Sequence, residues 1–295
     1  MKLGVCLPNY RSPASPQAIA EVAQRAEVLG FDSVWTTDHL VVPEAYLDRF
    51  GPVFYEPLTV LAYAAGVTRR VSLGTTAIIL SYRNPIVVAK TLETIDQLSG
   101  GRLIFGAASG WAEIEFRILG VPFDERGARS DEYLDIIKTL WTQEKPSFKG
   151  RFFSFSEVHF LPKPVQKPHP PIWIGGRSHR AIRRAVEHGA AWHPTYTPPE
   201  QLRADIAYMH GLSARKGRAA PPDVTLRLSI RLTAQPVLNG GRIHGTGTVQ
   251  QIVEDLQTYQ ALGVSHIVLD FPVETAGEIY RGMETVAKEV MPKVR

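Results

Sequence analysis

The sequence predicts an α/β protein built as a single (β/α)8 TIM barrel over residues 1–295. Short apolar, β-branched runs alternate along the chain with amphipathic stretches of helical period. Eight such runs begin near Leu3, Ser33, Val71, Arg102, Ile172, Ala190, Thr225 and Ser265. Strands that alternate with helices pair in parallel, and eight such units can close on themselves.

The helices of this barrel are predicted from the spacing of the apolar residues between the strands. The clearest stretches are residues 17–29, 57–66, 86–98, 127–141 and 249–262. Glycines follow several helical stretches, as expected where a left-handed residue ends a helix. These glycines are Gly30, Gly66, Gly189 and Gly263.

Two insertions interrupt the even spacing, one after strand four and one after strand seven. In the first, residues 151–160 alternate aromatic and polar side chains and predict a strand or hairpin. The prolines of residues 161–172 then impose an extended path. The second insertion, residues 235–247, contains NGG and GTG and is expected to be a mobile loop. Insertions at the catalytic face of a barrel usually shape a pocket and its lid.

Composition favours a cytoplasmic globular protein. Apolar residues make up 44% and charged residues 21% of the chain, as in proteins with a large core. No apolar run approaches the roughly 18 residues that span a bilayer, so no membrane association is expected. The first strand begins directly after Lys2, so we expect no signal peptide. The single cysteine, Cys6, excludes internal disulfides and cysteine-cluster metal sites.

The charge pattern argues against nucleic-acid binding. The net charge is +4 and the basic residues are scattered, without a cluster that is interleaved with aromatics. This excess either belongs to an ordinary solvated surface or receives an anionic ligand. The nine histidines include no HxH or HExxH pattern, so no metal site is expected.

Chemistry in a (β/α)8 barrel is carried by residues at the C-terminal ends of the strands. The residues predicted there are Asn9, Asp38, His39, Thr75, Thr76, Ser109, residues 175–178, His193 and Asp270.

The segment PPIWIGGRSHRAIRRAVEHG predicts a buried strand, a glycine pair and a helix. Gly175 and Gly176 would let backbone N–H groups approach an anion, and the helix N-terminus would add its dipole. Arg177 and Ser178 could then bind phosphate oxygens. The alternative is a tight turn that needs both glycines for steric reasons alone.

Asp38 and His39 end the second strand, SVWTTDHL. If the strand continues that far, only one of the two side chains can face the barrel mouth. A histidine there is a candidate proton donor or acceptor. The aspartate could hold the tautomer of the histidine or cap the next segment, and a purely structural pair is equally consistent with the sequence.

The third and fourth strands also carry unusual residues. Thr75 and Thr76 interrupt an apolar run, which indicates a bulge or a ligand contact. Residues 106–110, which include Ser109, are small and leave room for a flat ligand across the barrel mouth. A close helix–strand contact is the alternative.

Taken together, these segments resemble the bacterial luciferase-like superfamily of flavin and deazaflavin oxidoreductases. The resemblance is carried by LGFDSVWTTDHL, VSLGTTAIILSYRNPIVVAKTLETIDQLSGGRLIFGAASGW, EFRILGVPFDERGARSDEYL, PPIWIGGRSHRAIRRAVEHGAAWHP and GTVQQIVEDLQTYQALGVSHIVLDF. It covers essentially the whole chain, and it implies a barrel that binds coenzyme F420 or reduced FMN across its C-terminal face.

The resemblance also implies roles for particular residues. A non-prolyl cis peptide bond that supports the cofactor ring matches Thr76–Ala77. The active-site histidine matches His39, with Asp38 as the neighbouring acid. The phosphate-binding turn matches Gly175 and Gly176, beside Arg177 and Ser178.

Within the superfamily, GWAEIEFRILGVPFDERGARSDEYL is most similar to the probable F420-dependent oxidoreductases. Related sugar-phosphate dehydrogenases carry a glutamate where this chain has Trp111, and Glu113 and Glu115 are out of register with it. The sugar activity is therefore not carried over, and the proton donor stays open.

The expected activity is F420-dependent hydride transfer to or from a small organic substrate. A monooxygenase that uses reduced FMN is the main alternative, and a non-catalytic flavin or deazaflavin binder is an alternative of another class. A homodimer is also expected, because residues 57–66 are apolar nearly all round and residues 86–98 carry a broad apolar face.

Overall fold

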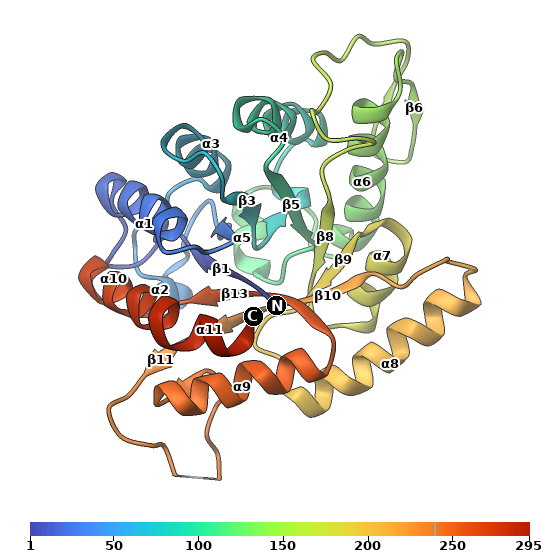
Figure 1. Cartoon of the computed structure of the whole chain (residues 1–295). Coiled ribbons are helices and arrows are strands. Elements are labelled where there is room, and N and C mark those ends of the chain that lie inside the picture. The colour runs from blue at the N-terminus through green and yellow to red at the C-terminus, as the bar shows by residue number, and fades with distance from the viewer. Residues whose placement is uncertain (239) are drawn as a thin grey trace.

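The computed structural model of the chain describes residues 1–238 and 240–295 and forms a closed parallel barrel surrounded by helices (Figure 1). The hydrogen-bonded order is β3-β2-β1-β13-β10-β9-β8-β5-β4, and the ring closes because β3 also pairs with β5. The barrel strands are β1 Lys2–Cys6, β2 Ser33–Thr36, β3 Ser72–Thr75, β4 Ile78–Ile79, β5 Leu103–Ala108, β8 Ile172–Gly175, β9 Ala191–His193, β10 Asp223–Ser229 and β13 Val264–Asp270. β3 and β4 are two parts of the third strand. The predicted (β/α)8 fold is confirmed.

The helices lie between successive strands and cover the outside of the barrel (Figure 1). They are α1 Pro16–Val28, α2 Leu47–Phe50, α3 Pro57–Val67, α4 Pro85–Ser99, α5 Glu113–Ile118, α6 Arg126–Thr142, α7 His179–His188, α8 Pro199–Arg215, α9 Val249–Ala261, α10 Ala276–Thr285 and α11 Met291–Val294, with short helical turns η1 Glu44–Tyr46, η2 Leu80–Tyr82 and η3 Val286–Val290. The side chain of the residue before α1, α4, α7, α9 and α10 accepts a backbone N–H of the first turn, which explains where these helices begin. No helix of the described part of the chain is both long and apolar enough to cross a membrane.

Two of the four predicted helix-ending glycines behave as expected. Gly30 and Gly263 have φ angles of 83° and 88°, in the left-handed region. For Gly66 the prediction was wrong. For Gly189 it was right about the helix end, because α7 ends at His188, and wrong about the left-handed backbone. Gly66 lies inside α3, and Gly189 has φ −95°. A Cβ atom at Gly189 would lie 3.0 Å from the carbonyl oxygens of Ala185 and Ala191, so close packing, rather than left-handed backbone, explains this glycine.

The two insertions lie where they were predicted. Strands β6 Phe148–Lys149 and β7 Ser154–Phe155 form an antiparallel hairpin outside the barrel, which confirms the extra hairpin. In the second insertion, β11 Arg231–Leu232 pairs in parallel with β12 Thr246–Gly247. The predicted mobile loop includes Asn239, which lies outside the described residues, and its mobility stays a prediction.

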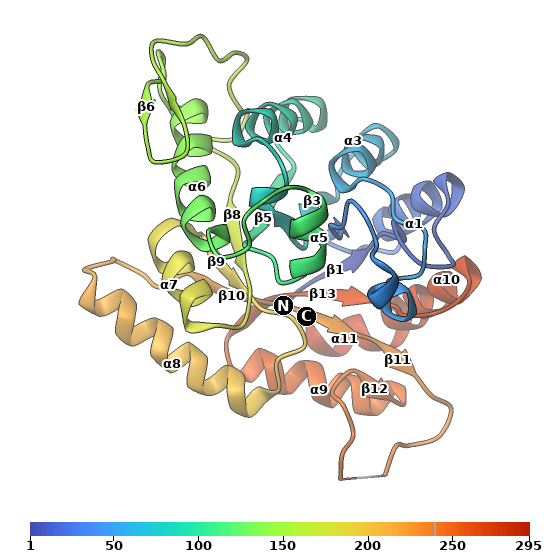
Figure 2. The same cartoon turned by 180° about the vertical axis from the view of Figure 1, so that it is seen from behind.

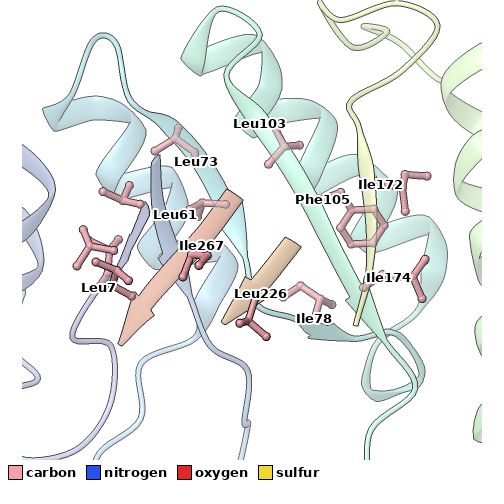
Figure 3. Packing of buried hydrophobic residues seen from close by; sticks show 14 of the residues in the cluster. Leu7, Leu61, Leu73, Ile78, Leu103, Phe105, Ile172, Ile174, Leu226 and Ile267 are labelled. Atoms are coloured by element: carbon pink, nitrogen blue, oxygen red, sulfur yellow. The ribbon is translucent and has the colours of Figure 1, made fainter. Parts of the chain in front are cut away.

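The alternation of side chains along the strands divides the core into two layers. Leu73, Leu103, Phe105, Ile172 and Ile267 point away from the barrel axis and pack under the helices (Figure 3).

The barrel interior instead holds aromatic and polar side chains. The indoles of Trp35 and Trp173 pack at 4.8 Å between ring centroids. Ser33 Oγ accepts the indole N–H of Trp35 at 2.6 Å and contacts Nε2 of His266 at 2.8 Å. His193 is also buried and lies at the C-terminal end of strand β9. Burial, as the main cause, lowers the pKa of His266 to about 4 and that of His193 to about 3.

These two histidines predict that the protein loses stability in mild acid. Their folded pKa values lie below the ordinary value of 6.5, so the unfolded chain binds more protons as the pH falls below 6.5. Between pH 7 and pH 5 each histidine should lower the free energy of unfolding by about 2 kcal/mol. Urea unfolding at both pH values measures this loss.

The variant His266→Gln should remove the His266 share of this pH dependence, because a glutamine can still hydrogen-bond Ser33 without titrating. His210 is exposed on α8, so His210→Gln is the matched control and should keep the full dependence. An unchanged pH dependence in His266→Gln would contradict the assignment.

Candidate active site

A cavity of about 1630 Å³ opens at the C-terminal ends of the barrel strands. Sites for a single small molecule usually measure about 300–1,000 Å³, so this cavity has room for a cofactor and a substrate together. Every residue predicted to catalyse or to bind the cofactor lines it. These residues are Asp38, His39, Thr76, Ala77, Ser109, Gly175, Gly176, Arg177 and Ser178.

Asp38 and His39 both reach the cavity, because strand β2 ends at Thr36, before either of them. The expectation that only one of the two side chains faces the barrel mouth held for a strand that continued to His39, so it does not apply here. Both side chains are buried, but they have different partners.

His39 is held by Glu115 of α5, the short helix after β5. His39 Nδ1 lies 2.5 Å from Glu115 Oε2, and Tyr82 donates its hydroxyl to the same oxygen at 2.9 Å. Oε1 accepts the backbone N–H groups of Leu40 and Val41 at 2.7 and 3.2 Å. Burial alone would raise the pKa of Glu115, but the hydrogen bonds from His39 and from the two backbone N–H groups outweigh it and lower this pKa.

The tautomer of His39 follows from these contacts. An ionised carboxylate only accepts hydrogen bonds, so His39 Nδ1 carries the proton that it donates to Glu115. Nε2 has no hydrogen-bond partner among the described residues, and the ring lines the cavity. The free nitrogen is therefore available to a ligand. Figure 2 shows α5 in front of the barrel strands on this side.

Glu115 is one of two buried charged residues at the site that sequence reasoning missed, and the other is Arg227. Glu113 and Glu115 are both close to the end of strand four, and no local pattern separates them. In the structure Glu115 is fully buried, whereas the side chain of Glu113 is exposed. Only the packing of α5 onto the segment after β2 distinguishes them.

Asp38 does not fix the tautomer of His39, so that suggestion is corrected. Its two oxygens accept a bidentate pair of hydrogen bonds from Arg83, at 2.7 and 2.9 Å. Asp38 Oδ2 also accepts the backbone N–H of Ile79 at 2.8 Å. The carboxylate thus ties the end of strand two to β4.

The cis peptide bond implied by the resemblance is present between Thr76 and Ala77, between β3 and β4. Thr76 Oγ1 lies 2.9 Å from His193 Nε2, and His193 Nδ1 lies 2.8 Å from Thr225 Oγ1. Thr225 donates its own proton to the carbonyl of Trp192, so it accepts from His193 Nδ1. His193 Nε2 is then an acceptor, and Thr76 donates to it.

A buried ion pair, Arg227 with Asp270, contacts the segment around the Thr76–Ala77 bond. Arg227 Nη2 donates to Asp270 Oδ2 at 2.8 Å, and Tyr196 donates its hydroxyl to the same oxygen at 2.8 Å. Arg227 Nη1 reaches the backbone oxygen of Thr76 at 3.3 Å. Burial opposes the charge of each partner, but the pairing outweighs it, raising the pKa of Arg227 and lowering that of Asp270. Asp270 was predicted from its strand end, and Arg227 was not.

The glycine turn after β8 has a steric reason that does not exclude an anion. A Cβ atom at Gly175 would lie 3.3 Å from the Cβ atoms of Ala77 and Ala108, and Gly176 has φ 121°. The Ser178 hydroxyl oxygen caps α7 by accepting the N–H of Ala181 at 3.2 Å, and its O–H can still donate to a ligand. The steric explanation and the anion-binding explanation of this turn therefore both agree with the structure.

Positive charge gathers beside this turn. Arg177 and Arg180 line the cavity at the start of α7. Neither forms an ion pair with any residue that the structure describes. Arg126 and Arg183 line the same end. The backbone N–H groups at the start of a ten-residue helix add their dipole there.

Ser109 provides a test of whether a polar ligand fits here. Its Oγ is buried and finds no hydrogen-bond partner among the described residues, although Ser109 lines the cavity. A buried hydroxyl without a partner is costly, so a ligand that bonds it would be favoured. With the cationic turn at the end of the neighbouring strand β8, the cavity suits a cofactor that has a polar ring and an anionic tail.

Comparison with known proteins finds relatives of this chain. A family model described as luciferase-like monooxygenase matches residues 1–237. The chain is 39% identical over 140 residues to the FMNH2-dependent dimethylsulfone monooxygenase of Pseudomonas putida, a match that covers 46% of this chain and 38% of that protein. It is 34% identical over 175 residues to the F420-dependent glucose-6-phosphate dehydrogenase of Amycolatopsis mediterranei, over 57% of this chain and 51% of that protein.

A solved structure shows the same fold along the whole chain. An F420-dependent secondary alcohol dehydrogenase in complex with an F420-acetone adduct superposes with a TM-score of 0.82. The two chains are 20% identical, and the match covers 100% of this chain and 99% of that one.

The contact between His39 and Glu115 predicts the effect of replacing the acid. In Glu115→Gln the side-chain amide can donate to Nδ1, so His39 should carry its proton on Nε2 instead. The ¹⁵N chemical shifts of the His39 ring report which nitrogen is protonated. We expect Nδ1–H in the wild type and Nε2–H in the variant. Glu113→Gln is the control and should leave the tautomer unchanged, and a wild-type Nε2–H tautomer would contradict the assignment.

Proposed function

The chain belongs to the luciferase-like monooxygenase family, and from this we propose that residues 1–295 form one barrel domain that acts as a cofactor-dependent oxidoreductase. Relatives use either F420 or FMNH2, and we propose coenzyme F420 for this chain. The observation that carries the proposal is the arrangement of His39 and Glu115, which leaves a free imidazole nitrogen in a cavity large enough for two ligands.

The residues that would hold the cofactor lie close together, since a Cβ atom at Gly175 would be 3.3 Å from the Cβ atoms of Ala77 and Ala108. Thr76, Ala77 and Ser109 would support the ring, and the turn of Gly175 and Gly176 would receive its phosphate. Arg177 and the Ser178 hydroxyl proton lie beside that turn. When bound, coenzyme F420 supplies a carbon that accepts or donates a hydride.

The charge of the cavity supports F420 over FMN. FMN ends in one phosphate, whereas F420 continues beyond its phosphodiester into a tail of carboxylates. Arg177, Arg180 and Arg183 at the start of α7, together with Arg126 at the start of α6, extend the positive region beyond the glycine turn. A longer polyanion uses all four cations, because each adds attraction to a carboxylate.

His39 is the proposed catalytic residue. With its Nδ1 proton held by Glu115, Nε2 can take the proton of a substrate hydroxyl. The buried carboxylate stabilises the imidazolium that results, as in other histidine–carboxylate pairs. In the reverse direction the same nitrogen returns the proton to a carbonyl oxygen.

We propose that Asp38 acts as a positioning residue. Its bonds to Arg83 and to the N–H of Ile79 hold the segment on both sides of the Thr76–Ala77 bond. The proposed substrate is a small organic molecule, and the proposed location is the cytoplasm.

The runner-up function is a monooxygenase that uses reduced FMN, as in the Pseudomonas relative. Ser109 and the glycine turn suit either cofactor. A non-catalytic binder is disfavoured because it has no use for a free His39 Nε2 beside an ionised Glu115. A metal-dependent hydrolase lacks support, since no group of three or more His, Cys, Asp and Glu residues could hold a metal within the described chain.

A homodimer through α3 and α4 is also proposed. The two helices pack side by side on the outside of the barrel (Figure 1). Their outer surface carries Tyr63 and Val87, with exposed fractions of 46% and 59%. A twofold axis would bury this apolar surface from each subunit together.

Cofactor titration tests the proposed function. We expect coenzyme F420 to bind more tightly than FMN, followed by absorbance and fluorescence of the ring. The double variant Arg177→Ser with Arg180→Ser should weaken F420 binding by about 10- to 100-fold, because charge-assisted bonds to the tail are lost. A substitution at Gly176 is a poorer test, since a Cβ there would lie 2.9 Å from the Cβ of Ala181.

Two variants serve as controls for this titration. Arg203→Ser changes an exposed arginine of α8 and should leave binding unchanged. His39→Ala should keep most of the cofactor affinity and lower turnover by roughly 10²- to 10⁴-fold, as expected for lost acid–base catalysis. Tighter binding of FMN, with oxygen uptake, would favour the monooxygenase, and binding of neither cofactor would refute the proposal.

Light scattering at micromolar concentration tests the dimer. The expected mass is about twice the 32.7 kDa of one chain. Val87→Asp places a charge on the exposed face of α4 and should yield monomers, whereas Val28→Asp on α1, where Val28 is 82% exposed, should not. A monomeric wild type would contradict the proposal.

A further inference from the structure

An aromatic recess surrounds the free nitrogen of His39. The ring centroid of Phe50 lies 4.4 Å from that of His39, that of Phe54 lies 5.3 Å away, and that of Trp111 lies 6.1 Å away. Phe50 belongs to α2, and Trp111 follows β5. Phe50 and Trp111 also line the cavity, so they give it an apolar wall beside His39.

Trp111 stands out because a large indole is left half-exposed inside a binding cavity. Its exposed fraction is 47%, and it lines the cavity. It is held in place by Tyr46, at 5.1 Å between ring centroids, and by Arg49, whose guanidinium lies 4.9 Å from the ring centroid. An apolar surface that is fixed and open toward a cavity is suited to stacking with a flat ligand group.

The two carboxylates near the recess are already occupied. Glu115 accepts from His39, Tyr82 and two backbone N–H groups, and Asp38 accepts from Arg83 and Ile79. Neither carboxylate is free to accept hydrogen bonds from the several hydroxyls of a polyol.

The other charged group of the recess is the Arg49 guanidinium, which lies over the rings of Phe50 and Trp111 at 5.2 and 4.9 Å. His39 Nε2 can serve one oxygen of the substrate, and the neighbouring rings offer a packing surface to the rest of it.

We propose that this recess selects a secondary alcohol or ketone whose reacting carbon carries a flat apolar group, aromatic or alicyclic, that stacks on Trp111. The proposal rests on the proposed function. The alcohol loses a hydride to the cofactor and a proton to His39, and it becomes the ketone. No further reactant is needed.

The test compares ketones on the protein loaded with coenzyme F420. Calorimetry gives the dissociation constants of acetophenone, acetone and glucose 6-phosphate, and steady-state rates give kcat/KM for 1-phenylethanol and 2-propanol. In the wild type, acetophenone should bind at least about 10-fold more tightly than acetone, with the same preference in kcat/KM, since a stacked and buried ring contributes on this scale.

Substitution of Trp111 tests whether the preference for acetophenone over acetone depends on the indole ring. Trp111→Ala should remove most of the difference between acetophenone and acetone, and Trp111→Phe should keep most of it. The dissociation constant of F420 should change little in both variants. Val28→Ala, a change on an exposed surface outside the cavity, should alter none of these values.

Three patterns of binding would overturn the proposal. They are an equal affinity of the wild type for the two ketones, tighter binding of glucose 6-phosphate, and a Trp111→Ala variant that loses F420 affinity while it keeps the ketone preference. The last result would place the indole against the cofactor. Failure to bind either ketone also refutes the substrate class, whereas failure of the wild type to bind F420 or FMN refutes the proposed function itself.

Discussion

The buried ion pair of Arg227 and Asp270 joins the ends of several barrel strands. A charged side chain inside a barrel is costly unless it is paired and hydrogen-bonded. The surrounding strand ends provide acceptors for both Nη nitrogens of Arg227, whereas its buried Nε finds no partner among the described residues. Arg227 contacts Asp270 of β13, Tyr10 after β1, and Thr37 after β2. It also reaches the backbone oxygen of Thr76, and so the position of the Thr76–Ala77 segment depends on the same cation.

This segment lines the cavity beside the glycine turn, because a Cβ atom at Gly175 would lie 3.3 Å from the Cβ of Ala77. The glycine turn and the cations of α7 suit an anionic tail. His39 and the aromatic rings come from other elements and suit an apolar substrate. We therefore propose that the specificity for the cofactor and the specificity for the substrate depend on different residues and can change independently.

Much of the fold could be predicted because its signals are local. Each barrel strand begins within two residues of the predicted position, since β-branched runs and the caps that follow them act over a few residues. Glycine was less informative. Gly30 adopts the left-handed backbone expected of it. At Gly189, in contrast, a side chain would come too close to two carbonyl oxygens, because they lie 3.0 Å from the place that a Cβ atom would take. The sequence shows the residue and not its neighbours.

The sequence by itself determined the barrel, the strand ends that carry the site, and the family to which these motifs point. Only the tertiary structure decided which acid serves His39, because Asp38 is its neighbour in sequence while Glu115 comes from a different βα loop. The role of Arg227 was also decided by the tertiary structure. In the sequence it is only a polar residue within an apolar strand, and its partner Asp270 comes from another strand. Hydrogen bonds depend on distances of about 3 Å. Distances of that kind between separate elements are set by how the helices and loops pack on the barrel.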